Sequence, residues 1–266
     1  MLRTFSGGLA AAIAIAAASS PAAAATVVLT SDATYTQNFD SLASSGTGTF
    51  ASLPAGVQAV ETGTNANGTY AAGTGSSNTG NTYSFGASGS TDRALGGLRS
   101  GSLIPLFGLA FTNETGREIT ELTVGFTGEQ WRLGFAGRAD RLDFEYAIGT
   151  GDITTGTYLS FDALDFSSPA ITGVGAKDGN AAAFRTVKLA TITGLSIADG
   201  QSFALRFADF NAADADDGLA IDDFSLTPTL AAAAVPEPAS WAMMIAGFTL
   251  AGTAMRRRNT GRIVLA

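Results

Sequence analysis

The stretch LDFEYAI, residues 142–148, decides the fold class of this chain. Its leucine, phenylalanine, tyrosine and isoleucine occupy every second position, and Asp143 and Glu145 stand between them. Successive side chains of a β-strand point to opposite faces of a sheet, so this period of two predicts a strand with one apolar and one polar face. Residues 203–207 and 122–127 repeat the pattern, and no window of similar length shows the 3.6-residue period of a helix.

Turn-forming clusters separate these runs, for example at residues 73–81 and 113–116. Glycine accepts positive φ, and short polar side chains bond to nearby backbone, so such clusters favour turns. Strands with one apolar face bury that face by stacking as two antiparallel sheets. The sequence therefore predicts an all-β domain at residues 26–227, an antiparallel β-sandwich of jelly-roll type. The polar stretch at residues 63–80 is expected to be a surface loop.

The N-terminal segment has the pattern of a secretory signal peptide. Arg3 gives it a positive start, residues 7–18 are apolar, and small residues at 21–25 suit cleavage after Ala25. We therefore expect residues 1–25 to be a signal peptide and the mature protein to be exported.

Composition excludes several classes of chemistry. Residues 26–235 carry 10 basic and 22 acidic side chains, a net charge of −12. A domain this acidic repels phosphate backbones, so nucleic acid is not an expected partner. The chain has no cysteine and no histidine. These absences exclude disulfides, thiol catalysis, Ser-His-Asp triads and metal sites built on imidazole or thiolate.

The alternation ends after Thr227, and residues 228–234 are expected to link the domain to the tail VPEPASWAMMIAGFTLAGTAMRRR, residues 235–258. Residues 241–255 are apolar except for two threonines. As a helix they rise about 22 Å, against a hydrocarbon core of about 30 Å. The sequence predicts a short transmembrane helix with the β domain outside, and residues 259–266 as a cytoplasmic tail on the arginine side.

The tail resembles the PEP-CTERM sorting signal, in its form with Trp-Ala after Pro-Glu-Pro. The resemblance implies recognition by an exosortase, a membrane protease of transpeptidase type, in bacteria that make exopolysaccharide. It also implies that the helix is removed after sorting; a permanent C-terminal anchor is the alternative. Eight residues follow the arginines here, a departure from the usual ending. The residues that carry the likeness are Pro236, Glu237, Pro238, Trp241, Arg256, Arg257 and Arg258.

The domain itself resembles a β-sandwich module of exported bacterial proteins that has no agreed activity. The likeness lies in residues 38–42, 53–56, 127–132, 178–180 and 217–226. Related jelly-roll folds, including carbohydrate-binding modules, begin with a Phe-Asp strand and end with an Ile-Asp-Asp strand. The neighbouring ends of those two strands often hold a structural Ca²⁺, and the resemblance implies the same arrangement here.

The acidic run at residues 214–223 is a candidate Ca²⁺ site, because it places five carboxylates within ten residues and Ca²⁺ takes six to eight oxygen ligands. In a regular strand Phe224 and Leu226 share a face with Asp222, so Asp222 is expected to point inward. A buried carboxylate needs a cation or hydrogen-bond donors. A solvated acidic turn, with Asp222 bonded to backbone N–H groups, is the alternative. The predicted ligands are Asp40, Asp217, Asp222 and Asp223.

Trp131, the one tryptophan outside the tail, is a candidate for stacking on a ligand. An exposed ring would suit a sugar, whereas a buried ring would belong to the core, and the sequence leaves both open. Asp143 and Glu145 resemble in spacing the carboxylate pair of retaining glycosidases, whose carboxyl groups lie about 5–5.5 Å apart. Acids on the solvent face of a half-exposed strand are common, so no catalytic residue is expected.

Together these features predict an exported, non-enzymatic protein of the cell surface or extracellular matrix, structural or adhesive and associated with exopolysaccharide. A carbohydrate-binding module with a structural Ca²⁺ site is the alternative, and it predicts exposed aromatics such as Trp131, Tyr146 and Tyr158 in a groove. An enzyme that uses carboxylates alone would instead bring two or more carboxylates together in a cleft. No cofactor other than Ca²⁺ is expected.

Overall fold

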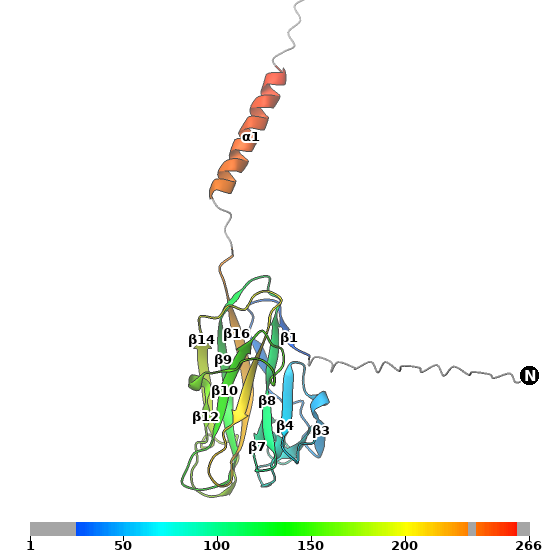
Figure 1. The fold of residues 1–266 in the computed structure, drawn as a ribbon, viewed down its shortest axis with the longest axis vertical. Helices are drawn as coiled ribbons and strands as arrows, with labels where there is room; N and C mark the ends of the chain where they lie inside the picture. Colours follow the sequence, from blue (N-terminus) through cyan, green and yellow to red (C-terminus); the bar gives the residue numbers. More distant parts are fainter. Residues whose placement is uncertain (1–24, 234–237, 260–266) are drawn as a thin grey trace, which may run out of the picture.

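The computed structural model describes residues 25–233 and 238–259 of the 266-residue chain. Two β-sheets face each other, and the one α-helix among the described residues, α1 (Pro238–Asn259), follows them in sequence (Figure 1). Most strand pairs are antiparallel; β1 with β8 and β5 with β6 are parallel. The all-β sandwich predicted from the sequence is confirmed. The predicted signal peptide at residues 1–25 lies outside the described residues except for Ala25.

The first sheet has seven strands in the order β1-β8-β15-β10-β11, with β4 also paired to β8 and β12 to β10. Its strands are β1 (Val27–Leu29), β4 (Val57–Thr62), β8 (Ile104–Asn113), β10 (Arg141–Ile148), β11 (Leu159–Ser160), β12 (Phe166–Ser167) and β15 (Ser202–Asp209). The short 3₁₀ helix η2 (Asp162–Leu164) lies between β11 and β12 in the chain.

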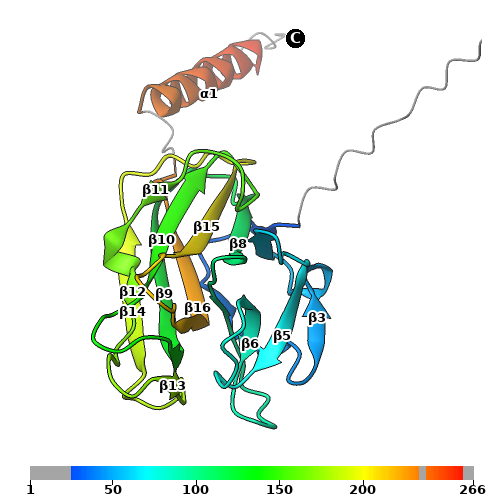
Figure 2. The same ribbon diagram turned by 60° about the horizontal axis from the view of Figure 1, so that its bottom comes forward.

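The second sheet has nine strands in the order β13-β9-β16-β7-β6-β5-β3, with β14 also paired to β9 and β2 to β16. Figure 2 shows β6, β5 and β3 on one side of the molecule, away from β10 and β14. The strands of the second sheet are β2 (Tyr35–Gln37), β3 (Thr47–Thr49), β5 (Thr69–Gly73), β6 (Asn81–Phe85), β7 (Ala94–Leu98), β9 (Ile119–Leu133), β13 (Gly175–Ala176), β14 (Arg185–Ile192) and β16 (Gly218–Leu230). The 3₁₀ helix η1 (Phe50–Ser52) follows β3.

The main core lies between the sheets and is rich in phenylalanine. The ring of Phe207 on β15 has three aromatic neighbours: Phe107 at 5.7 Å, Phe144 at 5.4 Å and Phe126 at 5.0 Å between centroids. Phe126 belongs to the second sheet and the others to the first, so these contacts join the layers. Edge-to-face and offset ring pairs of this kind add stability beyond their buried area.

A covering segment, residues 149–158, lies on the outer face of the first sheet. Its Ile153 is fully buried against alanines of β8 and β15. Its Tyr158 lies under the guanidinium of Arg206, 3.6 Å from the ring centroid. Arg206 also pairs with Glu145 at 2.6 Å. The polar face predicted for 142–148 is therefore partly covered instead of fully solvated.

A β-bulge in β16 overturns one expectation. Asp222 pairs with Thr127 and Ser225 with Gly125, so β16 uses three residues where β9 uses two. The extra residue, Asp223, has φ of 49°. A bulge shifts the alternation by one position, so Ile221 and Phe224 both enter the main core. The prediction that Asp222 shares a face with Phe224 is wrong for this reason.

The structure also differs from two boundaries that the sequence predicted. β16 continues to Leu230, three residues into the predicted linker, and pairs with β9 along that extension. β5 runs through the stretch 63–80 that was expected to be a loop, because Tyr70 is buried against the core.

In the tail, α1 has 22 residues. Of the helices within the described ranges, none has both the length and the apolarity needed to cross a membrane, contrary to the prediction for residues 241–255.

Candidate functional site

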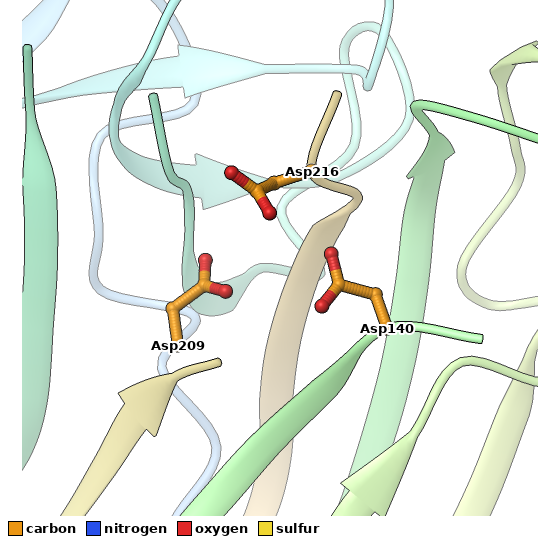
Figure 3. A group of neighbouring side chains, drawn as sticks. All are labelled: Asp140, Asp209 and Asp216. Atoms are coloured by element: carbon orange, nitrogen blue, oxygen red, sulfur yellow. The ribbon is translucent and has the colours of Figure 1, made fainter. Parts of the chain in front are cut away.

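Three aspartates, of which Asp140 is distant in sequence from the other two, meet at one end of the sandwich (Figure 3). Asp209 is the last residue of β15, Asp140 directly precedes β10, and Asp216 lies in the loop that crosses from β15 to β16. Leu142 and Asp209 are register partners, which brings the first two together. Ligand oxygens of all three lie within 4.8 Å of one another, and all three residues are buried. We call this group the aspartate cluster.

Asp140 and Asp216 accept hydrogen bonds from the surrounding backbone. Asp140 accepts from the N–H groups of Arg141 at 2.8 Å and Asp217 at 2.7 Å. Asp216 accepts from the N–H of Ala212 at 3.0 Å. Burial raises the pKa of both carboxyl groups, that of Asp216 to about 6, with repulsion from Asp140 as the next cause. Arg138, 3.6 Å from Asp140, lowers both pKa values in part.

Asp209 differs from its neighbours, because neither carboxylate oxygen has a hydrogen-bond partner among the described residues. Its side chain points toward the other two carboxylates (Figure 3), and the residue is 5% exposed. Burial raises its pKa well above the usual range, and repulsion from Asp140 and Asp216 raises it further. Arg99 donates to the backbone carbonyl of Asp209 at 3.0 Å, not to the carboxylate.

The neighbouring Asp217 has a structural role. Its carboxylate accepts from the N–H of Gly134 and from the side-chain amide of Gln130, both at 2.8 Å. Gly134 allows the close approach of the loop, since a Cβ there would lie 2.1 Å from the carbonyl oxygen of Asp216. With both oxygens bonded, Asp217 serves to fix the loop that carries Asp216.

An open pocket of about 670 Å³ borders the aspartate cluster. Asp216 lines it, together with Asn211 from the same loop and the side chains of Arg99 and Arg132. Asp140 and Asp209 do not line this pocket. Solvent therefore reaches the cluster from the side of Asp216.

Two strand patterns in the sequence indicate this cluster. Phe203, Leu205 and Phe207 point into the core, and one further step of the same period places Asp209 on that face. The period of Leu142 and Phe144, extended backward, does the same for Asp140. Only Asp216 depends on the course of a loop.

The predicted Ca²⁺ ligands do not come together. Within the described ranges one group of three carboxylates lies within 4.8 Å, and Asp40, Asp217, Asp222 and Asp223 are not part of it. Asp40 accepts from the N–H of Arg93 and from Asn38. Asp222 lies across from β9, accepts from the N–H of Asp223, and is 5% exposed.

Trp131 is a core residue, as the second of the two interpretations has it. It is 1% exposed and stacks on Phe85 at 5.9 Å, in a small cluster separate from the main core. Its indole N–H donates to Glu129 at 2.8 Å. Burial raises the pKa of Glu129 to about 7 and that of Asp222 to about 8, and repulsion from Glu129 adds to the rise at Asp222. Trp131 therefore presents no ring face to a ligand.

The tail contains the second functional segment. Pro238 is the first residue of α1, Trp241 is 58% exposed, and Arg256 and Arg257 lie exposed in its last turns. Arg258 belongs to α1 as well, whereas Pro236 and Glu237 lie outside the described residues.

Residues 234–258 match the PEP-CTERM protein-sorting motif. The PEP-CTERM match begins one residue before the predicted signal and ends at the same arginine. The recognition made from the sequence is confirmed. The chain thus carries the signal of an exported protein that an exosortase system sorts.

Other comparisons concern the fold. A tailspike protein of bacteriophage CBA120 aligns over 65% of this chain and 19% of its own, with 8% identity and a TM-score of 0.36, so the chain spans about a fifth of that protein. TmCBM61 in complex with β-1,4-galactotriose aligns over 53% and 74%, with 12% identity and a TM-score of 0.28. The CBM22-1–GH10 modules of a Clostridium thermocellum xylanase align over 75% and 28%, with 11% identity and a TM-score of 0.30. No curated protein matches the chain significantly.

Proposed function

We propose that this PEP-CTERM protein is a non-enzymatic component of a bacterial cell surface or extracellular matrix, where its sandwich acts as a structural or adhesive module beside exopolysaccharide. The sorting motif carries the proposal: it follows the last strand of a complete sandwich as a separate segment. An exosortase-type protease is the expected partner, and residues after the Pro-Glu-Pro stretch are expected to be removed.

The accessibility of the carboxylates supports a non-enzymatic role. A glycosidase needs two carboxyl groups that face the scissile bond from either side. The side chain of Asp140 is fully buried and the oxygens of Asp209 are inaccessible, so of the three only Asp216 faces the pocket. Asp143 and Glu145 are engaged by Arg141 and Arg206, respectively. Neither group offers a carboxylate pair to a substrate.

Binding of a specific glycan is the second candidate, and the distribution of aromatic side chains favours it at one place. Phe135 and Phe210 are 45% and 47% exposed, and each is adjacent in sequence to a residue of the 670 Å³ pocket. Arg141 lies over one face of the Phe210 ring, 5.0 Å from its centroid, so a sugar ring would stack on the other face of Phe210 or on Phe135. The aromatics predicted for this role do not fit it, because Trp131 is buried, Tyr146 packs against the main core, and Arg206 covers the ring of Tyr158.

Mass spectrometry of the mature protein tests the sorting proposal. The full chain is expressed in cells with an exosortase and in the same cells without it. We expect the surface or medium fraction of the first to end near residues 235–238 and the second to retain residues 241–258. Glu237→Ala should block processing, whereas Arg262→Gln, a charge change outside the motif, should not. Intact residues 241–258 in the exosortase-containing cells would refute the proposal.

A screen for binding and hydrolysis of exopolysaccharide tests the adhesive, non-enzymatic role. Retention of the polysaccharide without shortening of its chains supports the adhesive role. Loss of binding in both Phe135→Ala and Phe210→Ala, with unchanged thermal stability, favours a specific glycan site. Release of shorter saccharides would contradict the non-enzymatic role.

A further inference from the structure

We propose that Asp140, Asp209 and Asp216 bind one Ca²⁺ ion. Each comes from a different segment, yet their ligand oxygens lie within 4.8 Å of one another. Ca²⁺–oxygen distances are 2.3–2.6 Å, so a single ion between the three carboxylates contacts all of them after small side-chain adjustments. The proposal does not depend on sorting, because these residues lie in the sandwich and not in the tail.

The state of Asp209 is the observation that points to a ligand. The residue is 5% exposed, its carboxylate is directed at the other two, and both oxygens lack a hydrogen-bond partner among the residues that the structure describes. Buried carboxylates normally accept hydrogen bonds or coordinate a metal. Asp217 in the adjoining loop accepts hydrogen bonds, with Gly134 and Gln130 as donors. Asp209 has no such donor in the described ranges, which leaves coordination of a metal ion.

The charges around the cluster leave a cation to be supplied. Arg138 approaches Asp140 only at 3.6 Å, and its Nε and Nη2 donate to loop carbonyls instead. Arg99 donates to the backbone of Asp209 and to the side chain of Asn211. Neither guanidinium forms a close pair with the carboxylate of Asp209. Three carboxylates that face one another repel unless a cation lies between them.

The ligand chemistry favours Ca²⁺ among biological cations. All three ligands are hard oxygens, and the chain offers no histidine or cysteine to a softer metal. Ca²⁺ accepts six to eight oxygens in flexible geometry, whereas Mg²⁺ requires near-octahedral geometry at 2.0–2.1 Å and dehydrates reluctantly. The pocket on the side of Asp216 admits water to complete the coordination.

The position of the ion gives it a structural effect. Asp209 ends β15 and Asp140 directly precedes β10, both strands of the first sheet, and Asp216 leads into β16 of the second. A bound ion therefore joins the two sheets at the end of the sandwich and fixes the loop at residues 210–217.

Calorimetric titration and thermal melts of the EDTA-treated full chain test the proposal, with Ca²⁺ alone as the probe. Extracellular Ca²⁺ modules bind with Kd of about 0.1 to 1 mM. At about 10 mM Ca²⁺, mass action then raises Tm by about 3 to 10 °C in a domain of this size. Asp209→Asn should lose both the binding heat and the rise in Tm, and should melt above the wild type in EDTA because an unpaired buried charge is gone.

Asp214→Asn is the matched control, because Asp214 lies in the same loop, is exposed, and has φ of 66°, which asparagine tolerates. It should respond to Ca²⁺ as the wild type does. Asp216→Asn is the second cluster variant, for use if Asp209→Asn does not fold, and should also lose the response. A wild type without binding heat or Tm shift overturns the site, as do cluster variants that respond like the wild type. Equal stabilisation by Mg²⁺ overturns the choice of ion.

Discussion

Replacing Asp222 by asparagine should stabilise the protein at alkaline pH. The carboxyl group lies on β16 beside Glu129, and burial is the first cause that raises its pKa from 3.8 to about 8. Below about pH 4 the group is protonated in both the folded and the unfolded state, so it has no effect on stability. Between pH 4 and 8 only the unfolded state loses the proton, and the free energy of unfolding falls as pH rises.

The size of the effect follows from the shift. Each pKa unit is worth about 1.4 kcal/mol, so the rise from 3.8 to about 8 corresponds to about 6 kcal/mol. Partial solvent contact and side-chain relaxation reduce this, and we expect Asp222→Asn to gain about 2–4 kcal/mol at about pH 8.5 and almost nothing at about pH 4. The variant should therefore show a flatter dependence of stability on pH.

Urea unfolding in EDTA, followed by far-ultraviolet circular dichroism at several pH values, measures this gain. Asp223→Asn is the control: it removes the same charge from the next residue, which is exposed and at φ of 49° tolerates asparagine. An Asp222→Asn variant no more stable than the wild type at pH 8.5 would refute the reasoning. Equal gains in both variants would also do so, since the effect would then be one of net charge.

Four further substitutions probe the packing. Phe207→Ala removes a ring with three aromatic neighbours and should lower the free energy of unfolding, measured in urea, by about 3–5 kcal/mol. Phe210→Ala removes an exposed ring and should lower it by less than about 1 kcal/mol. Gly134→Ala places a Cβ 2.1 Å from a loop carbonyl, so hydrogen exchange in residues 210–217 should accelerate and the response to Ca²⁺ should weaken. Arg206→Ala loses the contact with Tyr158, and limited proteolysis should then cut the covering segment faster than in the wild type. An unchanged cleavage rate would show that Arg206 does not hold the segment.

Period-two alternation was sufficient to predict the sandwich, because the long strands β8, β9, β10, β15 and β16 each bury one face in the main, phenylalanine-rich core. It failed in β16, where the bulge at Asp223 adds one residue and reverses the faces of everything before it. Nothing in the sequence marks that bulge except an Asp-Asp pair, a type of residue that tolerates positive φ. The predicted Ca²⁺ site failed with it, since the site assumed that Asp222 points inward.

The aspartate cluster was half predictable. The positions of Asp140 and Asp209 follow from extending two correct strand patterns by one step, which puts an acid on a core face in each. Their meeting depends on strand order, because β10 and β15 are neighbours although the chain between them holds β11 to β14. Asp216 is placed by a loop that Arg138 holds through backbone carbonyls and Arg99 through the side chain of Asn211, contacts that no residue spacing reveals.

The course of β16 has a mechanical consequence. The strand starts beside the aspartate cluster, runs the length of the second sheet with β9 on one side and β7 and β2 on the other, and leads at Leu230 toward the sorting tail. If the protein is held at the Leu230 end while loops at the opposite end of the sandwich bind a partner, tension runs along the axis of β16. The ladder bonds on both flanks are then loaded in shear and resist together, instead of opening one after another. Force spectroscopy with the handle at Leu230 should give a higher rupture force than pulling β14 sideways from β9.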